Sequence, residues 1–167
     1  VIPNRAFLNF NGDDELNFKN VEKIGNYAFA KSFFVESTMF DGTKITSIGN
    51  SAFAESGLEG PMDLPSLQFI GEYAFASCES LERAVLPNNI KALPNGLFEK
   101  CNSLESIEIP DGVTSLGEYM FSMCNSLKTV KLGVGITEIP DYCFNYCTSL
   151  TNIILHECRC LFGNGIN

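Results

Sequence analysis

Hydrophobic positions recur along the chain with a period of 22 to 24 residues, and phenylalanine marks that period most clearly. We call these residues the anchor phenylalanines: Phe7, Phe29, Phe53, Phe75, Phe98, Phe121 and Phe144. Five residues before each anchor lies an aliphatic residue, as an inward-facing core column requires. These are Ile2, Ile24, Ile48, Ile70, Leu93, Leu116 and Ile139. Self-similarity at a fixed short period is typical of repeat proteins, so the pattern predicts a solenoid of seven repeats.

The two positions after the aliphatic column predict a turn and then the start of a short helix. The first position is always Gly or Pro, which marks a turn. The second is Asn, Asp or Glu; Asn and Asp can cap backbone N–H groups at a helix start, and Glu suits its positive end. We therefore expect each anchor segment to be a short helix or 3₁₀ turn with the phenylalanine buried beneath it.

A strand is predicted nine to eleven residues after each anchor, because inward apolar residues alternate there with outward ones at a period of two. The expected inward pairs are Leu16/Phe18, Thr38/Phe40, Met62/Leu64, Ala84/Leu86, Ile107/Ile109, Val130/Leu132 and Ile153/Leu155. Pro65, Pro87 and Pro110 end three of these strands. Stacked repeats then form a parallel sheet along one side and short helical turns along the other.

The last repeats carry a longer motif that resembles a known family. Residues 104–127 (LESIEIPDGVTSLGEYMFSMCNSL) and 127–150 (LKTVKLGVGITEIPDYCFNYCTSL) are similar to BspA-like leucine-rich repeats of the Treponema type. In the first three repeats Phe10, Ser32 and Ser56 replace the cysteine of that motif. The resemblance implies an α/β fold, a right-handed solenoid with a curved parallel sheet on one face and short helical or 3₁₀ turns on the other. It also implies a surface-exposed or secreted protein, since several members act as adhesins or host-interaction modules.

We expect one leucine-rich-repeat domain. Its repeats are irregular in residues 1–69 and regular in residues 70–155, and residues 156–167 form a C-terminal cap or tail. The chain starts without Met or a leader segment, so a signal peptide is expected to be cleaved or to lie outside this sequence. A start at a repeat boundary without an obvious cap fits a fragment of a longer protein.

Four of the seven cysteines, Cys78, Cys101, Cys124 and Cys147, are spaced 23 residues apart. We interpret them as a buried ladder of free thiols acting as small hydrophobic groups, because identical side-chain directions give poor disulfide torsions. Cys143 replaces Ala, Leu or Met of earlier repeats and is also expected in the core.

The C-terminal cluster of His156, Cys158 and Cys160 lies where the repeat stops. We favour an end segment with free thiols. A disulfide that includes Cys158 or Cys160, or a metal site that also uses Cys147, stays open, although the Cys-x-Cys spacing is tighter than in usual zinc knuckles.

Two further patterns have a structural and a functional interpretation. Tyr27, Tyr73, Tyr119 and Tyr142 stand two residues before an anchor. A packed row with wet hydroxyls is favoured over an exposed row that binds glycan or peptide. The run 11–15 (NGDDE) is expected to be a solvated turn, since it lacks the full ligand spacing of a calcium loop.

Composition narrows the function. Twenty acidic and eleven basic residues give a net charge of −9, which argues against nucleic-acid binding. No apolar run approaches the roughly 18 to 20 residues of a membrane span, so we expect no membrane insertion by this segment. His156 is the only histidine, and no catalytic or phosphate-binding motif occurs. We therefore expect no enzyme activity, no cofactor and no metal.

The outward strand residues form the candidate binding site, because they change chemistry between repeats while the core columns do not. On the concave face of the regular repeats they are Arg83, Val85, Ser106, Glu108, Thr129, Lys131, Asn152 and Ile154. We expect a protein-binding module whose partner is a host or matrix protein, with the oligomeric state left open. The alternatives are a structural spacer or an accessory domain of a larger surface protein or enzyme.

Overall fold

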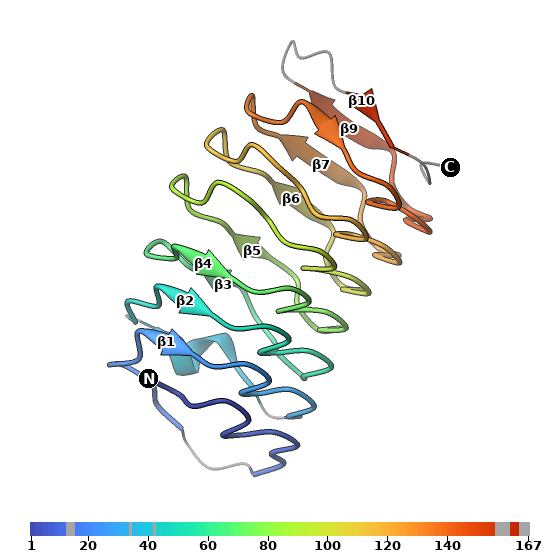
Figure 1. Ribbon diagram of the computed structural model, residues 1–167. Coiled ribbons are helices and arrows are strands. Elements are labelled where there is room, and N and C mark those ends of the chain that lie inside the picture. The colour runs from blue at the N-terminus through green and yellow to red at the C-terminus, as the bar shows by residue number, and fades with distance from the viewer. Residues whose placement is uncertain (13–15, 34, 42, 156–160, 164–167) are drawn as a thin grey trace.

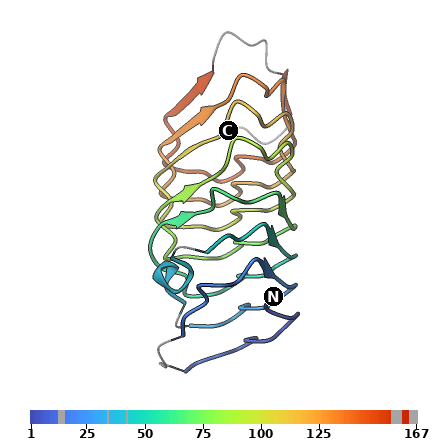
Figure 2. The same cartoon turned by 90° about the vertical axis from the view of Figure 1, so that its left-hand side faces the viewer.

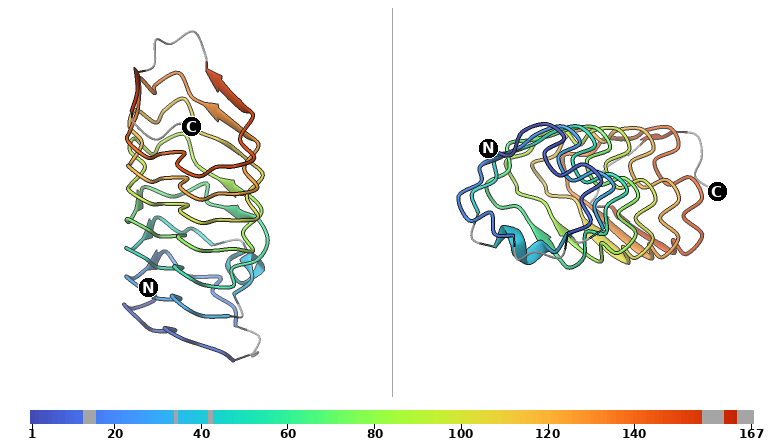
Figure 3. Two further views of the ribbon diagram at one scale, coloured as in Figure 1. Left: turned by 90° about the vertical axis from the view of Figure 1, so that its right-hand side faces the viewer. Right: turned by 90° about the horizontal axis from the view of Figure 1, so that it is seen from below.

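The computed structural model describes residues 1–12, 16–33, 35–41, 43–155 and 161–163. Figure 1 shows the chain wound into a stack of coils that follow one another from the N-terminus to the C-terminus. The views turned by 90° show strands along two sides of the stack (Figures 2 and 3). Every strand pair among the described residues is parallel, which confirms the predicted solenoid. We number the coils 1 to 7 by their anchors, from Phe7 to Phe144.

One side of the stack carries the predicted strands, which we call the sheet face. They are β3 (Met62–Asp63), β5 (Ala84–Val85), β6 (Ser106–Glu108), β7 (Thr129–Leu132) and β9 (Asn152–Leu155). β3 pairs with β5, and β7 pairs with both β6 and β9. The inward residues of β5, β6 and β7 are buried, so the predicted alternation is confirmed there.

The prediction of strands in coils 1 and 2 is wrong. In coil 2, Ser37–Phe40 forms the 3₁₀ helix η1, and Thr38, an expected inward residue, is exposed. Adjacent Met39 and Phe40 both pack on the core, which the period of two in a strand does not allow. In coil 1, residues 16–18 have no strand, and Phe18 is only partly buried.

The opposite side carries a second set of short strands, which the sequence analysis did not predict. They are β1 (Lys23–Ile24), β2 (Ser47–Ile48), β4 (Phe69–Ile70), β8 (Glu138–Ile139) and β10 (Leu161–Phe162). β2 pairs with both β1 and β4, and β8 pairs with β10. β1, β2, β4 and β8 each end at a residue of the aliphatic column. The members of this column, from Ile2 to Ile139, are buried as predicted.

The anchor segments are turns, so the helices expected there are not formed. In a helix the backbone N–H groups bond to carbonyls of the same segment. Here successive N–H groups alternate between a carbonyl of the next coil and a carbonyl of their own turn. Phe29 donates its N–H to Ala52 of the next coil (2.7 Å), and Ala30 donates to Tyr27 of its own turn (3.3 Å). The residues two before and two after each anchor have a positive φ in all seven coils. Left-handed backbone at these two positions aims alternate N–H groups at the neighbouring coil.

The anchor phenylalanines stack along the axis of the solenoid. Consecutive ring centroids lie 5.1 to 5.9 Å apart, with interplanar angles of 1° to 14°. The rings from Phe29 to Phe144 are buried, as the repeat pattern predicts, and the ring of Phe7 is partly buried. Each ring therefore packs on a copy of itself from the neighbouring coil, which explains why this position does not vary.

The Asn residues three before the anchor act between coils instead of capping their own segment. The Asn26 side-chain oxygen accepts the N–H of Asn50 (2.8 Å), and the Asn50 oxygen accepts the N–H of Glu72 (3.1 Å). The glycine before Asn50 is required by this contact, since a Cβ on Gly49 would lie 2.4 Å from the Asn26 oxygen. The predicted capping residues thus satisfy backbone donors one coil away.

The stacked core predicts a large effect of removing one ring. Phe98→Ala or Phe121→Ala should lower the free energy of unfolding by about 3 to 5 kcal/mol, because a cavity is left between two coils. Denaturant melts measure this difference. Phe33→Ala serves as the control, since the Phe33 side chain is 66% exposed and its loss should matter little. A decrease below about 1 kcal/mol for the anchor variants would contradict their burial.

Candidate functional site

The predicted site residues lie in rows across the sheet face. Ser106, Thr129 and Asn152 are opposite one another in register, and so are Glu108, Lys131 and Ile154. Arg83 and Ile154 are exposed, and Val85 is half-buried. The regular spacing of β6, β7 and β9 holds six of the eight side chains in fixed relative positions.

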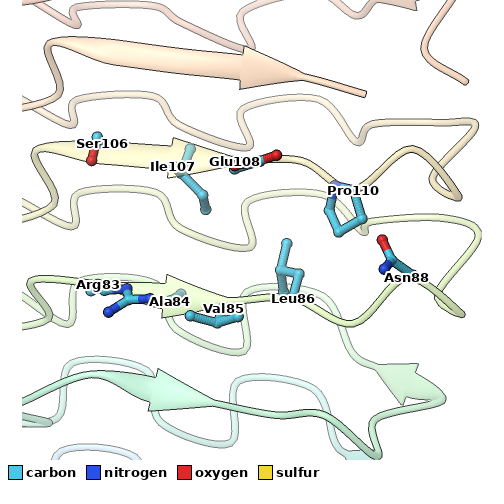
Figure 4. A pocket seen from close by; sticks show the side chains of 9 residues that line it. All are labelled: Arg83, Ala84, Val85, Leu86, Asn88, Ser106, Ile107, Glu108 and Pro110. Carbon is cyan, nitrogen blue, oxygen red and sulfur yellow. The ribbon is translucent and has the colours of Figure 1, made fainter. Parts of the chain in front are cut away.

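A hollow of about 350 Å³ lies between β5 and β6. Four of the predicted residues line it: Arg83, Val85, Ser106 and Glu108. Figure 4 shows these side chains on the two neighbouring strands, with Leu86, Asn88 and Pro110 at the end of the hollow. Thr129, Lys131, Asn152 and Ile154 do not line it, so the structure brings together half of the predicted set.

The hollow coincides with an interruption of the sheet. β5 pairs with β3 and β6 pairs with β7, but within residues 43–155 no backbone hydrogen bond joins β5 to β6. The same two coils stay connected on their turn side, where Phe75 donates its N–H to Leu97 (3.1 Å). The strands of coils 4 and 5, β5 and β6, are therefore not joined by backbone hydrogen bonds, and residues of both strands line the hollow.

The charges on the sheet face are distributed unequally. Lys131 Nζ lies 2.6 Å from Glu108 Oε1, and Lys128 Nζ lies 2.9 Å from Glu105 Oε1. The hydrogen bond with Glu108, together with its negative charge, raises the pKa of Lys131. Among the described residues, the Arg83 side chain has no hydrogen bond or ion pair, although its backbone carbonyl accepts the N–H of Met62 (3.0 Å). The two lysines are thus neutralised by glutamates of the neighbouring coil, whereas the Arg83 guanidinium has no acidic partner among the described side chains.

A second hollow of about 590 Å³ adjoins the first and is lined by polar side chains. Its lining consists of Glu82, Arg83, Ser103, Glu105, Ser106 and Ser126. Because Arg83 and Ser106 line both hollows, the Arg83 guanidinium can serve a ligand that enters either one. The serine hydroxyls of this second hollow were missed by sequence reasoning, which considered only the strand positions.

A third hollow, of about 520 Å³, lies at the corner of coils 2 to 5 and was also not foreseen. Its lining includes Phe33, Gly57 and Lys100. The Phe33 side chain is 66% exposed although it follows an anchor segment. The available signal in the sequence was that the second repeat has two phenylalanines, Phe33 and Phe34, in addition to those of the core columns.

Three of the four ladder cysteines, Cys78, Cys101 and Cys124, are buried as predicted, and Cys147 is partly buried. The ladder also has a role that the sequence analysis missed. Each thiol donates a hydrogen bond to the carbonyl of the anchor phenylalanine in the preceding coil. The Sγ···O distances are 3.0 Å for Cys78, 3.1 Å for Cys101, 3.0 Å for Cys124 and 2.9 Å for Cys147. In coil 2 the Ser32 hydroxyl makes the same bond to the carbonyl of Phe7. Ser at this position in two early repeats was the available signal for a hydrogen-bond donor.

Burial keeps these thiols neutral. It raises the pKa of Cys78 to about 12 and that of Cys147, which is less buried, to about 11. The pKa values of Cys101, Cys124 and Cys143 are also raised by burial. All five are free cysteines. Since the thiolate is the nucleophile and the metal ligand, the ladder is chemically inert at neutral pH.

The other candidate ligand groups are the C-terminal His/Cys cluster and the acidic run near the N-terminus. Within the described ranges, no group of three or more His, Cys, Asp or Glu side chains is arranged to hold a metal ion. His156, Cys158 and Cys160 lie outside the described residues, as do Asp13, Asp14 and Glu15 of the NGDDE run. In the part of the chain that the structure describes, no helix is long and apolar enough to span a membrane.

The tyrosines lie along the turns, away from the sheet face. The rings of Tyr119 and Tyr142 stack at 5.1 Å with an interplanar angle of 7°. Tyr27 is 42% exposed and Tyr142 is 39% exposed. The row is thus packed between neighbours and also open to solvent.

A solenoid of short parallel strands and tight turns that repeat in every coil is typical of leucine-rich-repeat proteins. The chain belongs to the BspA-type family, because the model of the BspA type leucine rich repeat region matches in six copies over residues 1–66 and 68–161. This match confirms the resemblance inferred from the repeat motif.

Solved structures show the same fold. A leucine-rich cell surface protein of Faecalibacterium prausnitzii has a TM-score of 0.61 and 26% identity; the alignment covers 89% of this chain and 34% of that one. A leucine-rich repeat protein of Bacteroides ovatus has a TM-score of 0.54 and 22% identity, with 99% and 61% covered. The leucine-rich repeat protein of Treponema pallidum has a TM-score of 0.54 and 21% identity, with 87% and 76% covered.

The chain thus spans about a third of the Faecalibacterium protein and 61% of the Bacteroides protein. A search of curated proteins finds no match. The comparisons establish the family and the fold of this chain.

The burial of the ladder predicts slow thiol modification. Cys78, Cys101 and Cys124 should react with iodoacetamide far more slowly in the folded protein than after denaturation without reductant, because they are inaccessible and protonated. Peptide mapping by mass spectrometry gives the extent at each cysteine. If these thiols were absent from the denatured, unreduced protein, they would be disulfide-bonded and the ladder would be wrong.

The raised pKa of Cys78 predicts a loss of stability at alkaline pH. The neutral thiol is stabilised by folding, so its contribution is complete below pH 9.0 and is lost as the pH rises toward about 12. Above pH 9, unfolding of the wild type should become easier by up to about 1.4 kcal/mol per pH unit relative to Cys78→Ser, which keeps a donor without the titration. Urea melts at several pH values test this, and parallel pH profiles for the two proteins would contradict it.

Proposed function

We propose that this chain is a non-catalytic protein-binding module of a surface or secreted protein, and that it binds its partner through the sheet face. The observation that carries the proposal is the hollow between β5 and β6, where four outward residues of two strands converge. A structural spacer has no need for such a hollow or for an unpaired arginine beside it. A host or matrix protein is the partner that we propose.

Arg83 is the central contact of this proposal. The guanidinium is exposed and makes no hydrogen bond or ion pair with the described residues, so binding need not break an existing interaction. It offers a planar set of donors that fits a carboxylate bidentately and that also stacks on aromatic rings. Val85 and Leu86 add apolar surface beside it. We therefore expect an acidic or aromatic side chain of the partner to enter this hollow.

The remaining predicted residues extend the contact along β7 and β9. Thr129, Asn152 and Ile154 project from the same face, and Ile154 is 47% exposed. Strand positions are held by the solenoid, so little side-chain and backbone entropy is lost when a partner binds. The Glu108–Lys131 pair contributes less to binding, because its two charges already neutralise each other.

The location of the protein is part of the same proposal. The Faecalibacterium relative is described as a cell surface protein, and this chain covers 34% of it at 26% identity. We extend that location to this chain, together with an adhesive role. A net charge of −9 also keeps the module soluble and disfavours contact with acidic polymers.

Arg83→Ala should weaken binding to the partner about tenfold or more, because arginine at the centre of an interface is a frequent hot spot. The measurement is surface plasmon resonance against a panel of immobilised matrix and plasma proteins. Folding should be unaffected, with a free energy of unfolding within about 0.5 kcal/mol of the wild type.

Two controls accompany this variant. Lys44→Ala removes an exposed cation outside the hollow and should leave binding unchanged. Arg83→Lys keeps the charge but not the bidentate geometry, and it should restore binding only in part. Full binding by Arg83→Ala would move the site away from this hollow. Absence of binding to any protein, with a folded wild type, would favour the spacer.

A further inference from the structure

The residues two before the anchors form a continuous row along the turns, which we call the tyrosine row. Its members are Arg5, Tyr27, Ser51, Tyr73, Gly96, Tyr119 and Tyr142. All seven have a positive φ between 50° and 59°. Because their backbone conformation is repeated, the side chains leave their coils in similar directions, and Arg5 meets Tyr27 and Tyr119 meets Tyr142 of the following coil.

Two rings of the tyrosine row are contacted by a side chain of the neighbouring coil. The guanidinium carbon of Arg5 lies 5.6 Å from the centre of the Tyr27 ring in the next coil, which is a cation–π contact. Tyr119 lies on Tyr142 in the same manner, with a ring in place of the cation. Tyr27 is therefore contacted by a guanidinium from the coil before it, and Tyr142 by another ring.

Coil 3 interrupts this arrangement. Its member is Ser51, whose side chain is too short to cover the Tyr73 ring of coil 4. On its other side Tyr73 lies against the backbone of coil 5, since a Cβ on Gly96 would be 2.1 Å from the ring. In the described part of the chain, no aromatic stack or cation–π contact includes Tyr73. Tyr73 is half-buried, and no ring or cation of the described residues takes over Tyr73 the position that Arg5 takes over Tyr27.

The charge around the row favours a cation at that position. Glu72 directly precedes Tyr73 and is exposed; one of its oxygens accepts a hydrogen bond of 3.4 Å from Asn95 Nδ2. Glu118 and Asp141 hold the same place beside Tyr119 and Tyr142. Partial burial, and then the charges of Tyr142, Glu118, Tyr73 and Asp141, raise the pKa of Tyr119. A carboxylate beside an open ring is suited to an arginine or lysine side chain.

We propose that the tyrosine row is a second contact surface, which takes a basic side chain of a protein partner onto the ring of Tyr73 beside Glu72. The partner's guanidinium or ammonium occupies the place over Tyr73 that Arg5 occupies over Tyr27. This surface lies on the turns and uses none of the sheet-face residues, so it stands independently of the function proposed above.

The test is an NMR titration with N-acetyl-arginine amide, read on the ring resonances of Tyr73. A saturable shift is expected, and N-acetyl-citrulline amide, which has the same shape without the charge, should produce less than about a fifth of it. Ser51→Arg should abolish the response, because the new arginine covers Tyr73 from within the chain. The Tyr73 resonances of that variant should resemble those of the arginine-saturated wild type.

Ser77→Arg is the matched control. It introduces the same side chain at a φ of 56°, in the column two residues after the anchor, where Lys31 and Lys100 show that a long cation is accepted. This variant should respond as the wild type does. Circular dichroism and thermal melts verify that both variants are folded. We expect Ser51→Arg to fold, because Arg5 occupies the same position of coil 1 at a φ of 59°.

Three outcomes would overturn the proposal. An equal shift with the citrulline compound would show that charge is not recognised. An unchanged response in Ser51→Arg would place the ligand elsewhere. A Tyr73 response to chito-oligosaccharide that exceeds the response to arginine would assign the row to glycan.

Discussion

The left-handed backbone on both sides of each anchor phenylalanine is the constraint on which the rest of this solenoid depends. It divides the N–H groups of a turn into two sets, one of which closes the turn while the other binds the next coil, as Ala30 and Phe29 do. A helix at this place would direct its N–H groups along its own axis and would not provide the regular hydrogen bonds that join neighbouring coils. The spacing that the ladder imposes is also the spacing at which the Phe rings stack, so hydrogen bonding and core packing reinforce each other.

Side chains then complete what the backbone ladder leaves unsatisfied. The Asn oxygens accept N–H groups from the following coil, and the Cys or Ser donors reach the anchor carbonyl of the preceding coil. A carbonyl such as that of Phe75 accepts both the Cys78 N–H of its own turn and the Cys101 thiol. Buried polar groups without partners are expensive, which explains why these columns admit so few residue types. The thiols are therefore structural donors whose burial removes their reactivity.

The sequence predicted most of the fold, because every core column contacts its own copies and must repeat. The period gave the coils, the buried Ile, Leu and Phe columns, and the alternation in β6 and β7. It did not give the left-handed turns, since Tyr27, Lys31 and Met123 are residue types that rarely adopt a positive φ. Nor did it give the interruption between β5 and β6, where the spacing between anchors remains 23 residues. Half of the candidate site was found because strand alternation places Arg83, Val85, Ser106 and Glu108 outward; their convergence depends on a missing ladder that no residue type encodes.

Regularity and recognition thus occupy different parts of the same coil. A position that touches its copies in both neighbouring coils cannot change alone, so a change there would need compensation along the whole stack. Positions that point away from the stack are free of this requirement, and both proposed contacts use them. The hollow at Arg83 arises where the hydrogen bonds between β5 and β6 are missing while those between the turns persist, and the Tyr73 ring lacks the contact that Arg5 makes with Tyr27 because Ser51 interrupts a row of longer side chains. In each case a local departure from the repeat removes a contact that other coils make, and the intact hydrogen bonds of the turns hold the neighbouring coils together.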